Sequence, residues 1–280
     1  MRWLPALALF VFVLHAQTDG LKIENAVVRT FDEGPIAASD YRFRAGETVY
    51  FSFQVSGYRT QSVEFDVSKV HLSWTIAVQD DKGVPLEKTT EGTIDTTVTP
   101  EDRNWKPIER RNIVLPPIVP EGRFHVLLEV RDELAKSSRK ADIPFLLAGY
   151  TAAPDAPLSA RNFRFYRTSE EKDALEVAAY TPGDTLWARF EIIGYQLGEG
   201  NRYSVEYGLK VLKADGSLAF EQPDAAQTDG APFYAQRMVP GVLSLSIPKD
   251  MAKSNYTLVV TVTDRLSGRT AEARQTFSVE

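Results

Sequence analysis

The sequence predicts an all-β protein made of two tandem units, each a sandwich of about seven strands. Three observations lead to this prediction. A segment of the first half of the chain recurs in the second half, hydrophobic and polar side chains alternate in many segments, and no stretch of ten or more residues keeps helical spacing. Turn residues separate the alternating segments, as is typical of two packed sheets.

The internal repeat is clearest where residues 45–58 reappear as residues 182–195, with every position shifted by 137. Asn25 and Asn162 keep the same spacing ahead of these segments. A repeated unit of roughly 130 residues has the size of a domain, so the repeat indicates two domains rather than a solenoid.

The domain boundaries follow from the repeat and from the first residues of the chain. Residues 1–16 place Arg2 ahead of an apolar run, which is the pattern of a cleaved signal peptide. This run is too short to cross about 30 Å of bilayer. We expect one domain over residues 17–151, a second over residues 152–280, and a mature protein in the periplasm or outside the cell.

Composition excludes several kinds of chemistry and partner. The chain has no cysteine, which excludes disulfides, thiol catalysis and thiolate metal sites. Removing Arg2 with the signal leaves 31 of the 32 basic residues against 38 acidic ones, a formal charge of −7. This balance does not favour nucleic acid or anionic lipid. No other apolar stretch could span a membrane after signal removal.

Alternating residues predict matching strands in the two units. Residues 49–55 alternate valine and phenylalanine with polar residues, and residues 186–192 repeat the pattern. The next strands, 72–78 and 205–211, lead into turns in which a glycine supplies the positive φ of a hairpin. Each strand is therefore expected to bury one face.

The end of each unit carries a further hairpin. Strands over 124–130 and 256–262 stop at Asp132 and Asp264, each followed by a short loop and a final strand. Between the early and late strands of the first unit, residues 91–108 are expected to form a long loop.

These strands resemble the immunoglobulin-like sandwich repeats of bacterial secreted and surface proteins. Trp74 and Tyr207 resemble the aromatic residue that such domains bury on the third strand. Tyr256 resembles the tyrosine whose hydroxyl closes a corner near the penultimate strand, and the first unit departs there with Phe124. The resemblance implies an immunoglobulin-like fold.

The strand openings at 45–49 and 182–186 are also similar to those of macroglobulin-type sandwich domains. The thioester chemistry of that family requires a cysteine, so it does not carry over to this chain. The resemblance to macroglobulin and fibronectin-like sandwiches therefore implies fold and not function.

The sequence gives no sign of an enzyme or a cofactor. It has no nucleophile elbow, phosphate-binding loop, dinucleotide fingerprint or zinc-protease motif. His71 and His125, the histidines that follow the signal, have no counterpart in the other unit and are expected on the surface. We therefore expect a protein that is not an enzyme and binds no cofactor.

Calcium is the metal that the sequence leaves open. Asp132 and Asp264 recur at the same place in both units, and loop carboxylates bind calcium in some secreted domains. The alternative is that each aspartate accepts backbone N–H groups within its hairpin turn. The second interpretation is preferred.

Aromatic residues define the candidate binding surface. Tyr50 and Trp187 occupy equivalent positions on the parity opposite to the core, Tyr58 and Tyr195 follow on that parity, and Trp105 lies in the expected long loop. Such side chains can be covered by a neighbouring loop or domain, or they can contact a ligand.

Two functional hypotheses follow. The first is a non-enzymatic interaction module that binds a protein partner. The alternative is a carbohydrate-binding module in which outward aromatic residues stack on a polysaccharide.

Overall fold

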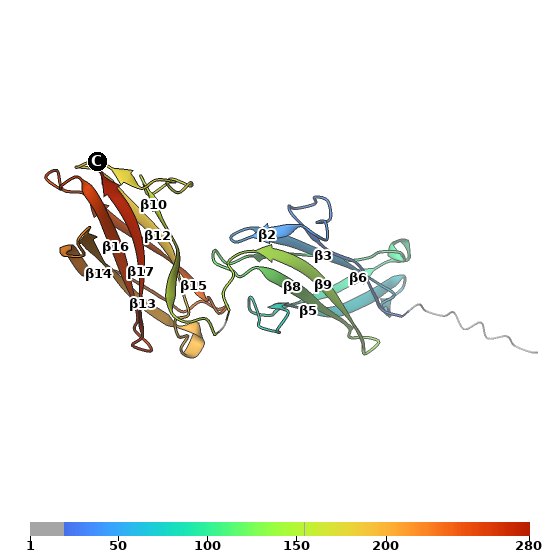
Figure 1. Cartoon of the computed structure of the whole chain (residues 1–280). Helices are drawn as coiled ribbons and strands as arrows, with labels where there is room; N and C mark the ends of the chain where they lie inside the picture. The colour runs from blue at the N-terminus through green and yellow to red at the C-terminus, as the bar shows by residue number, and fades with distance from the viewer. Residues whose placement is uncertain (1–19, 154) are drawn as a thin grey trace, which may run out of the picture.

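The computed structural model describes residues 20–153 and 155–280, so the predicted signal peptide lies outside the described residues. The all-β prediction is confirmed, because four sheets form two sandwich bodies and the described chain has no α-helix. The two bodies lie end to end along an elongated molecule (Figure 1).

The first body packs a small sheet against a large one. The small sheet has the order β1-β3-β7, with β1 (Lys22–Arg29), β3 (Thr48–Ser56) and β7 (Ile108–Val114). The large sheet has the order β2-β9-β8-β5-β4, with β2 (Arg42–Arg44), β9 (Ser137–Ala148), β8 (Gly122–Asp132), β5 (Val67–Asp80) and β4 (Gln61–Glu64). In this sheet β6 (Thr90–Val98) pairs with β5.

The second body repeats this arrangement. Its small sheet has the order β10-β12-β15, with β10 (Ser159–Tyr166), β12 (Thr185–Ile193) and β15 (Met238–Ser246). Its large sheet has the order β11-β17-β16-β13-β14, with β11 (Ala179–Tyr180), β17 (Thr270–Val279), β16 (Ser254–Asp264), β13 (Tyr203–Lys213) and β14 (Leu218–Gly230).

The described part of the chain thus has more strands than the seven expected per unit, namely β1–β9 and β10–β17. The prediction of a long loop over residues 91–108 is wrong, because strand β6 occupies much of this range. The strand is hard to recognise in the sequence because it contains Gly92, and glycine is uncommon in strands. The Trp74 ring lies over Gly92, and a Cβ there would come within 2.3 Å of the ring. Glycine in a strand often marks such a close approach.

The predicted alternation places the core between the sheets. Phe51, Phe53, Val49 and Val55 of β3 are at most 1% exposed, and their neighbours along the strand are half-buried. Burying an aliphatic or aromatic side chain of this kind contributes roughly 2 kcal/mol. Each body has its own cluster of buried residues.

The repeated asparagines have a backbone role. Asn25 and Asn162 adopt left-handed conformations, with φ of 49° and 53°. Each lies in a β-bulge, where the pairing of β1 with β3 or of β10 with β12 shifts register. Asparagine tolerates this conformation better than most residues, which accounts for its recurrence.

The corner expected at Tyr256 is present. Its hydroxyl donates a hydrogen bond of 2.7 Å to the carbonyl of Ala252, four residues upstream. The first body has Phe124 at this place, and that ring instead contacts the second body.

A tyrosine of the second body completes the core of the first. Tyr234 is 8% exposed, packs its ring 6.0 Å from that of Phe124, and donates a hydrogen bond of 3.0 Å to Asp80. Nearby, the backbone N–H of Arg237 donates to the hydroxyl of Tyr150 at 2.8 Å. We call this contact the junction.

The loop that carries Tyr234 is hydrogen-bonded to its own body. Tyr195 donates its hydroxyl to the carbonyl of Gln236, and the side-chain amide of Asn201 donates to the carbonyls of Pro232 and Phe233. Tyr234 is therefore presented to the first body by a loop with several hydrogen bonds to the second body.

Removing the junction ring tests its contribution. Replacing Tyr234 with Ala is expected to lower the free energy of unfolding by about 3 kcal/mol, since a buried aromatic side chain is lost. Calorimetric unfolding should then separate into two transitions. Phe233→Ala, at the 49% exposed neighbour, should change stability by less than about 0.5 kcal/mol. Equal effects of the two variants would contradict this role.

Candidate binding surface

A groove lies at the end of the first body that points away from the second; Figure 1 shows how the two bodies are arranged. β5 runs from this groove at Val67 to the junction at Asp80. The groove has a volume of about 810 Å3 and is lined by the start of β1, the end of β6, and the loops after β3 and β6. We call this region the free end.

Two of the predicted aromatic residues meet at the free end. Tyr58 donates its hydroxyl to the carbonyl of Trp105 at 2.7 Å, and the two rings contact edge to face with centroids 6.4 Å apart. Trp105 remains 38% exposed. The one-turn helix η1 (Pro100–Asp102) shapes the loop, because Asp102 accepts hydrogen bonds from the backbone and hydroxyl of Thr99.

A hairpin with exposed apolar residues flanks the same groove. The short strand β4 turns into β5 through Phe65 and Asp66, and Asp66 adopts a positive φ of 56°. Phe65 is 92% exposed and Val63 is 52% exposed. This hairpin was not predicted; its signal in the sequence is the alternation of Val63, Phe65 and Val67 with polar residues.

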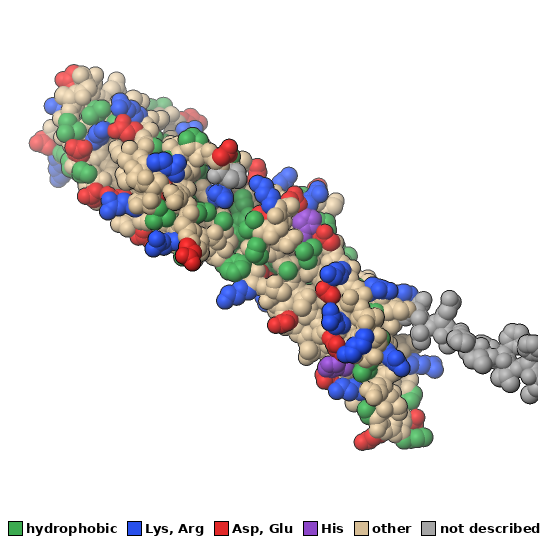
Figure 2. Space-filling view, turned by 90° about the horizontal axis from the view of Figure 1, so that it is seen from below, with side chains coloured by type: hydrophobic (Ala, Val, Ile, Leu, Met, Phe, Trp, Pro, Cys, Tyr) green, Lys and Arg blue, Asp and Glu red, His purple; other side chains and the backbone are tan. Residues whose placement is uncertain are grey.

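Charges at the free end are mixed in sign. Lys106 forms an ion pair with Glu24, and this contact together with the hydroxyl of Ser56 lowers the pKa of Glu24. Burial raises the pKa of Tyr58, and Asp102 adds to the effect. Elsewhere too, basic and acidic side chains are interspersed over the face seen in Figure 2. The free end therefore lacks the single sign of charge that attracts a polyanion.

Tyr50 and Trp187 lie apart from the free end. Both are half-buried on the outer faces of the two small sheets. Tyr50 borders a hollow of about 340 Å3 with Arg29 and Asn112. Near Trp187, Arg189 lies 4.2 Å over the ring of Tyr166 and donates to the carbonyls of the loop that follows β10.

Tyr195 does not lie on the outer face as expected. It is 7% exposed, and its ring packs 5.4 Å from that of Tyr203 in the core. Gly194 precedes it with a φ of 75°, which turns the chain and ends the alternation of the strand. Of the predicted aromatic residues, the structure thus brings together Tyr58 and Trp105.

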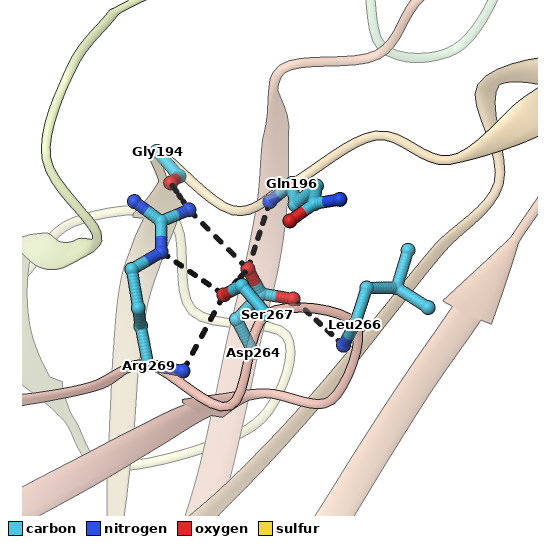
Figure 3. Close-up of polar contacts among 6 residues, drawn as sticks. All are labelled: Gly194, Gln196, Asp264, Leu266, Ser267 and Arg269. Carbon is cyan, nitrogen blue, oxygen red and sulfur yellow. Dashed lines mark hydrogen bonds and ion pairs between the residues drawn. The ribbon is translucent and has the colours of Figure 1, made fainter.

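The two recurring aspartates connect the sheets of each body. Asp264 is fully buried and accepts hydrogen bonds from the backbone N–H of Gln196 at 2.9 Å and of Leu266 at 3.1 Å (Figure 3). The hydroxyl of Ser267 and the guanidinium of Arg269 complete its surroundings.

Asp132 makes the matching contacts in the first body. It is 1% exposed and accepts from the backbone N–H groups of Arg59, Leu134 and Ala135. Both carboxylates thus bind the turn of their own hairpin and the chain that leaves the small sheet. This is the turn role that the sequence favoured for them over calcium binding.

Both histidines of the first body contact aspartates on its surface. His125 contacts Asp142 at 2.7 Å and Asp81 at 2.8 Å, and His71 contacts Asp95 at 3.0 Å. Among the described residues, no group of three or more histidine, aspartate or glutamate side chains is placed to hold a metal ion. None of the helices in this part of the chain is both long and apolar enough to cross a membrane.

Comparison with protein families finds no matching family, and comparison with curated protein sequences finds no similar protein. Among solved structures, the chain is similar to the C-terminal domain of the Streptococcus pyogenes antigen I/II-family protein AspA. The identity is 7% and the TM-score 0.31, over 93% of this chain and 99% of that one. A likeness at this level carries no information about function.

The buried aspartate makes stability depend on pH. Burial alone would raise the pKa of Asp264, but hydrogen bonds from Ser267, Gln196 and Leu266 outweigh it and hold the pKa below its ordinary value. A carboxyl group whose pKa is lowered by folding stabilises the fold when the pH is above its unfolded pKa of about 4. This stabilisation is lost as the pH falls through the pKa of the folded state.

Replacing Asp264 with Asn should lower the free energy of unfolding by about 2–4 kcal/mol at neutral pH, because the buried N–H groups lose their charged acceptor. The variant should also lose part of the decline in stability at acid pH. Denaturant titrations between about pH 3 and 7 measure both effects. Asp250→Asn, at an exposed turn, is the control. An unchanged acid slope in Asp264→Asn would refute this account.

His125 should titrate above an ordinary histidine. Its hydrogen bonds to Asp81 and Asp142 raise its pKa from the usual value of about 6.5. Its stabilising contribution is therefore complete below pH 6.5 and is lost as the pH rises through the higher folded value. NMR titration of the ring should show this shift, and Asp81→Asn should reduce it. A ring that titrates as in an unfolded peptide would contradict the ion pairs.

Proposed function

We propose that the chain is a non-enzymatic binding module of the periplasm or cell exterior that engages a protein partner through the free end of its first body. Residues 17–151 and 152–280 would form its two immunoglobulin-like domains. The observation that carries the proposal is Phe65, whose ring is 92% exposed beside a groove lined by Tyr58 and Trp105. Exposed aromatic residues at such a site act as anchors of protein interfaces.

The arrangement of the rings favours a protein over a polysaccharide. Tyr58 and Trp105 meet at an interplanar angle of 79°, so they do not form a flat platform for a sugar ring. The hydroxyl of Tyr58 is already bound to a carbonyl. Phe65 and Val63 provide apolar surface without hydroxyl-binding groups of their own.

The carbohydrate alternative rests on different residues. Tyr50 borders a hollow with Arg29 and Asn112, groups that can bind sugar hydroxyls. Binding on a glycan array that is lost in Tyr50→Ala and retained in Phe65→Ser would favour this alternative.

Secretion is supported by the apolar run near Arg2. Edge strands on all four sheets offer further surface for association.

A capture experiment tests the proposed surface. Mature protein tagged at its C-terminus is incubated with envelope extract, and its partner is identified and its affinity measured. Phe65→Ser should weaken binding at least about tenfold, as expected for an interface anchor. Val177→Ser is the matched control, because Val177 is 72% exposed on the second body. Equal capture by wild type and Phe65→Ser would refute the proposal.

A further inference from the structure

Another groove lies where the two bodies meet. It has a volume of about 360 Å3 and is lined by the turn after β5, the start of β8, the chain after β9 and the loop before β15. Its walls therefore come from both bodies. We call it the junction groove. Small-molecule sites are often found between domains, and this volume lies within their usual range.

Arg237 brings a positive charge to the junction groove. Its backbone N–H donates to the hydroxyl of Tyr150 at 2.8 Å, which holds the main chain at the wall of the groove. Burial raises the pKa of Tyr150 and of Tyr234, and the positive charge of Arg237 counteracts this rise in both. The guanidinium therefore lies near two tyrosines that line the same groove.

Arg237 is half-buried, yet its guanidinium forms no ion pair or hydrogen bond with a residue of the described chain. The other half-buried arginines of this part of the chain all have a side-chain partner: Arg29 with Ser52, Arg111 with Glu87, Arg161 with Glu191, and Arg189 with loop carbonyls. Withdrawing a guanidinium from water without a counter-charge is unfavourable. An anion in the junction groove would supply the partner that Arg237 lacks.

Two more cations border the junction groove. Lys82 and Arg123 are exposed, and neither forms an ion pair with a described residue. Both belong to the first body, whereas Arg237 belongs to the second. An anion in this groove is therefore attracted by charges of both bodies.

The acidic groups of the junction groove favour an anion with a single charge. Each of them has another partner: Asp80 with Tyr234, Asp81 with His125, and Glu121 with Thr151. Their negative charges oppose a ligand with several charges, such as a phosphate. A carboxylate meets less repulsion, and a guanidinium binds it through two parallel hydrogen bonds.

Apolar surface lies beside these charges. Phe124, Tyr150 and Tyr234 line the junction groove, and the rings of Phe124 and Tyr234 are in contact. Val84 lines it as well and is 38% exposed. Such surroundings favour an apolar or aromatic group attached to the carboxylate.

We propose that the junction groove binds a small organic carboxylate with an apolar or aromatic group, and that Arg237 holds the carboxylate. This inference goes beyond the proposed function, because the site lies apart from the free end and shares no residue with it. The carboxylate belongs either to a free acid or to the C-terminal residue of a peptide. Binding between the bodies would stabilise their arrangement at the junction.

NMR titration of the backbone amides in the mature protein, with N-acetyl-phenylalanine as the probe, tests this site. A ligand of this size should bind with a dissociation constant on the order of 1 mM, and the largest shift changes should occur at Arg237 and its neighbours. N-acetyl-phenylalaninamide, which lacks the negative charge, should bind at least about tenfold more weakly. Phenyl phosphate should also bind more weakly than the carboxylate, because of the acidic groups of the groove.

A short peptide that ends in phenylalanine identifies the source of the carboxylate. Tighter binding of this peptide than of N-acetyl-phenylalanine indicates a peptide end as the ligand. Equal or weaker binding of the peptide indicates a free acid.

Substitutions of Arg237 test its role. Arg237→Gln should weaken binding of N-acetyl-phenylalanine at least about tenfold, because it removes the charge and keeps the backbone N–H that binds Tyr150. Arg237→Lys should have an intermediate affinity, since lysine keeps the charge and loses the paired donors. Arg167→Gln, at an exposed position of the second body outside the groove, is the matched control and should bind as the wild type does. Thermal unfolding verifies that each variant folds.

Several results would overturn this inference. They are no binding of N-acetyl-phenylalanine at about 10 mM, equal binding of its neutral amide, or equal affinities of wild type and Arg237→Gln. Equal or tighter binding of phenyl phosphate would overturn the assignment to a carboxylate. Capture of a protein partner through Phe65 does not involve Arg237, so the failure of one test leaves the other proposal standing.

Discussion

Both bodies depend on a buried carboxylate that ties their two sheets together. Asp132 and Asp264 end a strand of the large sheet, yet they accept hydrogen bonds from Arg59 and Gln196, which follow the central strand of the small sheet. A three-stranded sheet on its own presents little surface for packing. In a chain without cysteine, these polar contacts provide a directional link between sheets that otherwise adhere through apolar side chains.

The two repeated units share the residues that shape the sandwich and differ in the residues at their ends. The bulge asparagines, the turn glycines and the buried aspartates keep their places, because each satisfies a backbone requirement of the sandwich. The ends differ in the residues they present. Tyr234 faces Asp80 inside the molecule, while Trp105 and Phe65 are exposed in the first body. Specific recognition in this protein is therefore expected at the ends of the bodies rather than on their sheets.

Sequence alone predicts the parts of the structure that depend on local periodicity. The alternation in β3 and β12 and the turn role of Asp132 and Asp264 follow from residue patterns. The strand β6 was missed because Gly92 lies beneath Trp74, a contact across the sheet that no local pattern reveals. Tyr195 was predicted on the outer face but is buried, because the positive φ of Gly194 turns the chain and ends the alternation of the strand. The exposure of Phe65 and the insertion of Tyr234 depend on tertiary structure, which periodicity does not encode.

The insertion of Tyr234 also bears on how the chain is made. Ala148, which ends the last strand of the first body, and Tyr234 are 86 positions apart, so at the usual rate of synthesis roughly ten seconds pass between them. During this time the first body exists with an open apolar end around Phe124, since the ring that covers it has yet to emerge. The nascent chain is then most exposed to aggregation, and chaperones that bind apolar surface have their clearest target. Completion of the second body closes that interval.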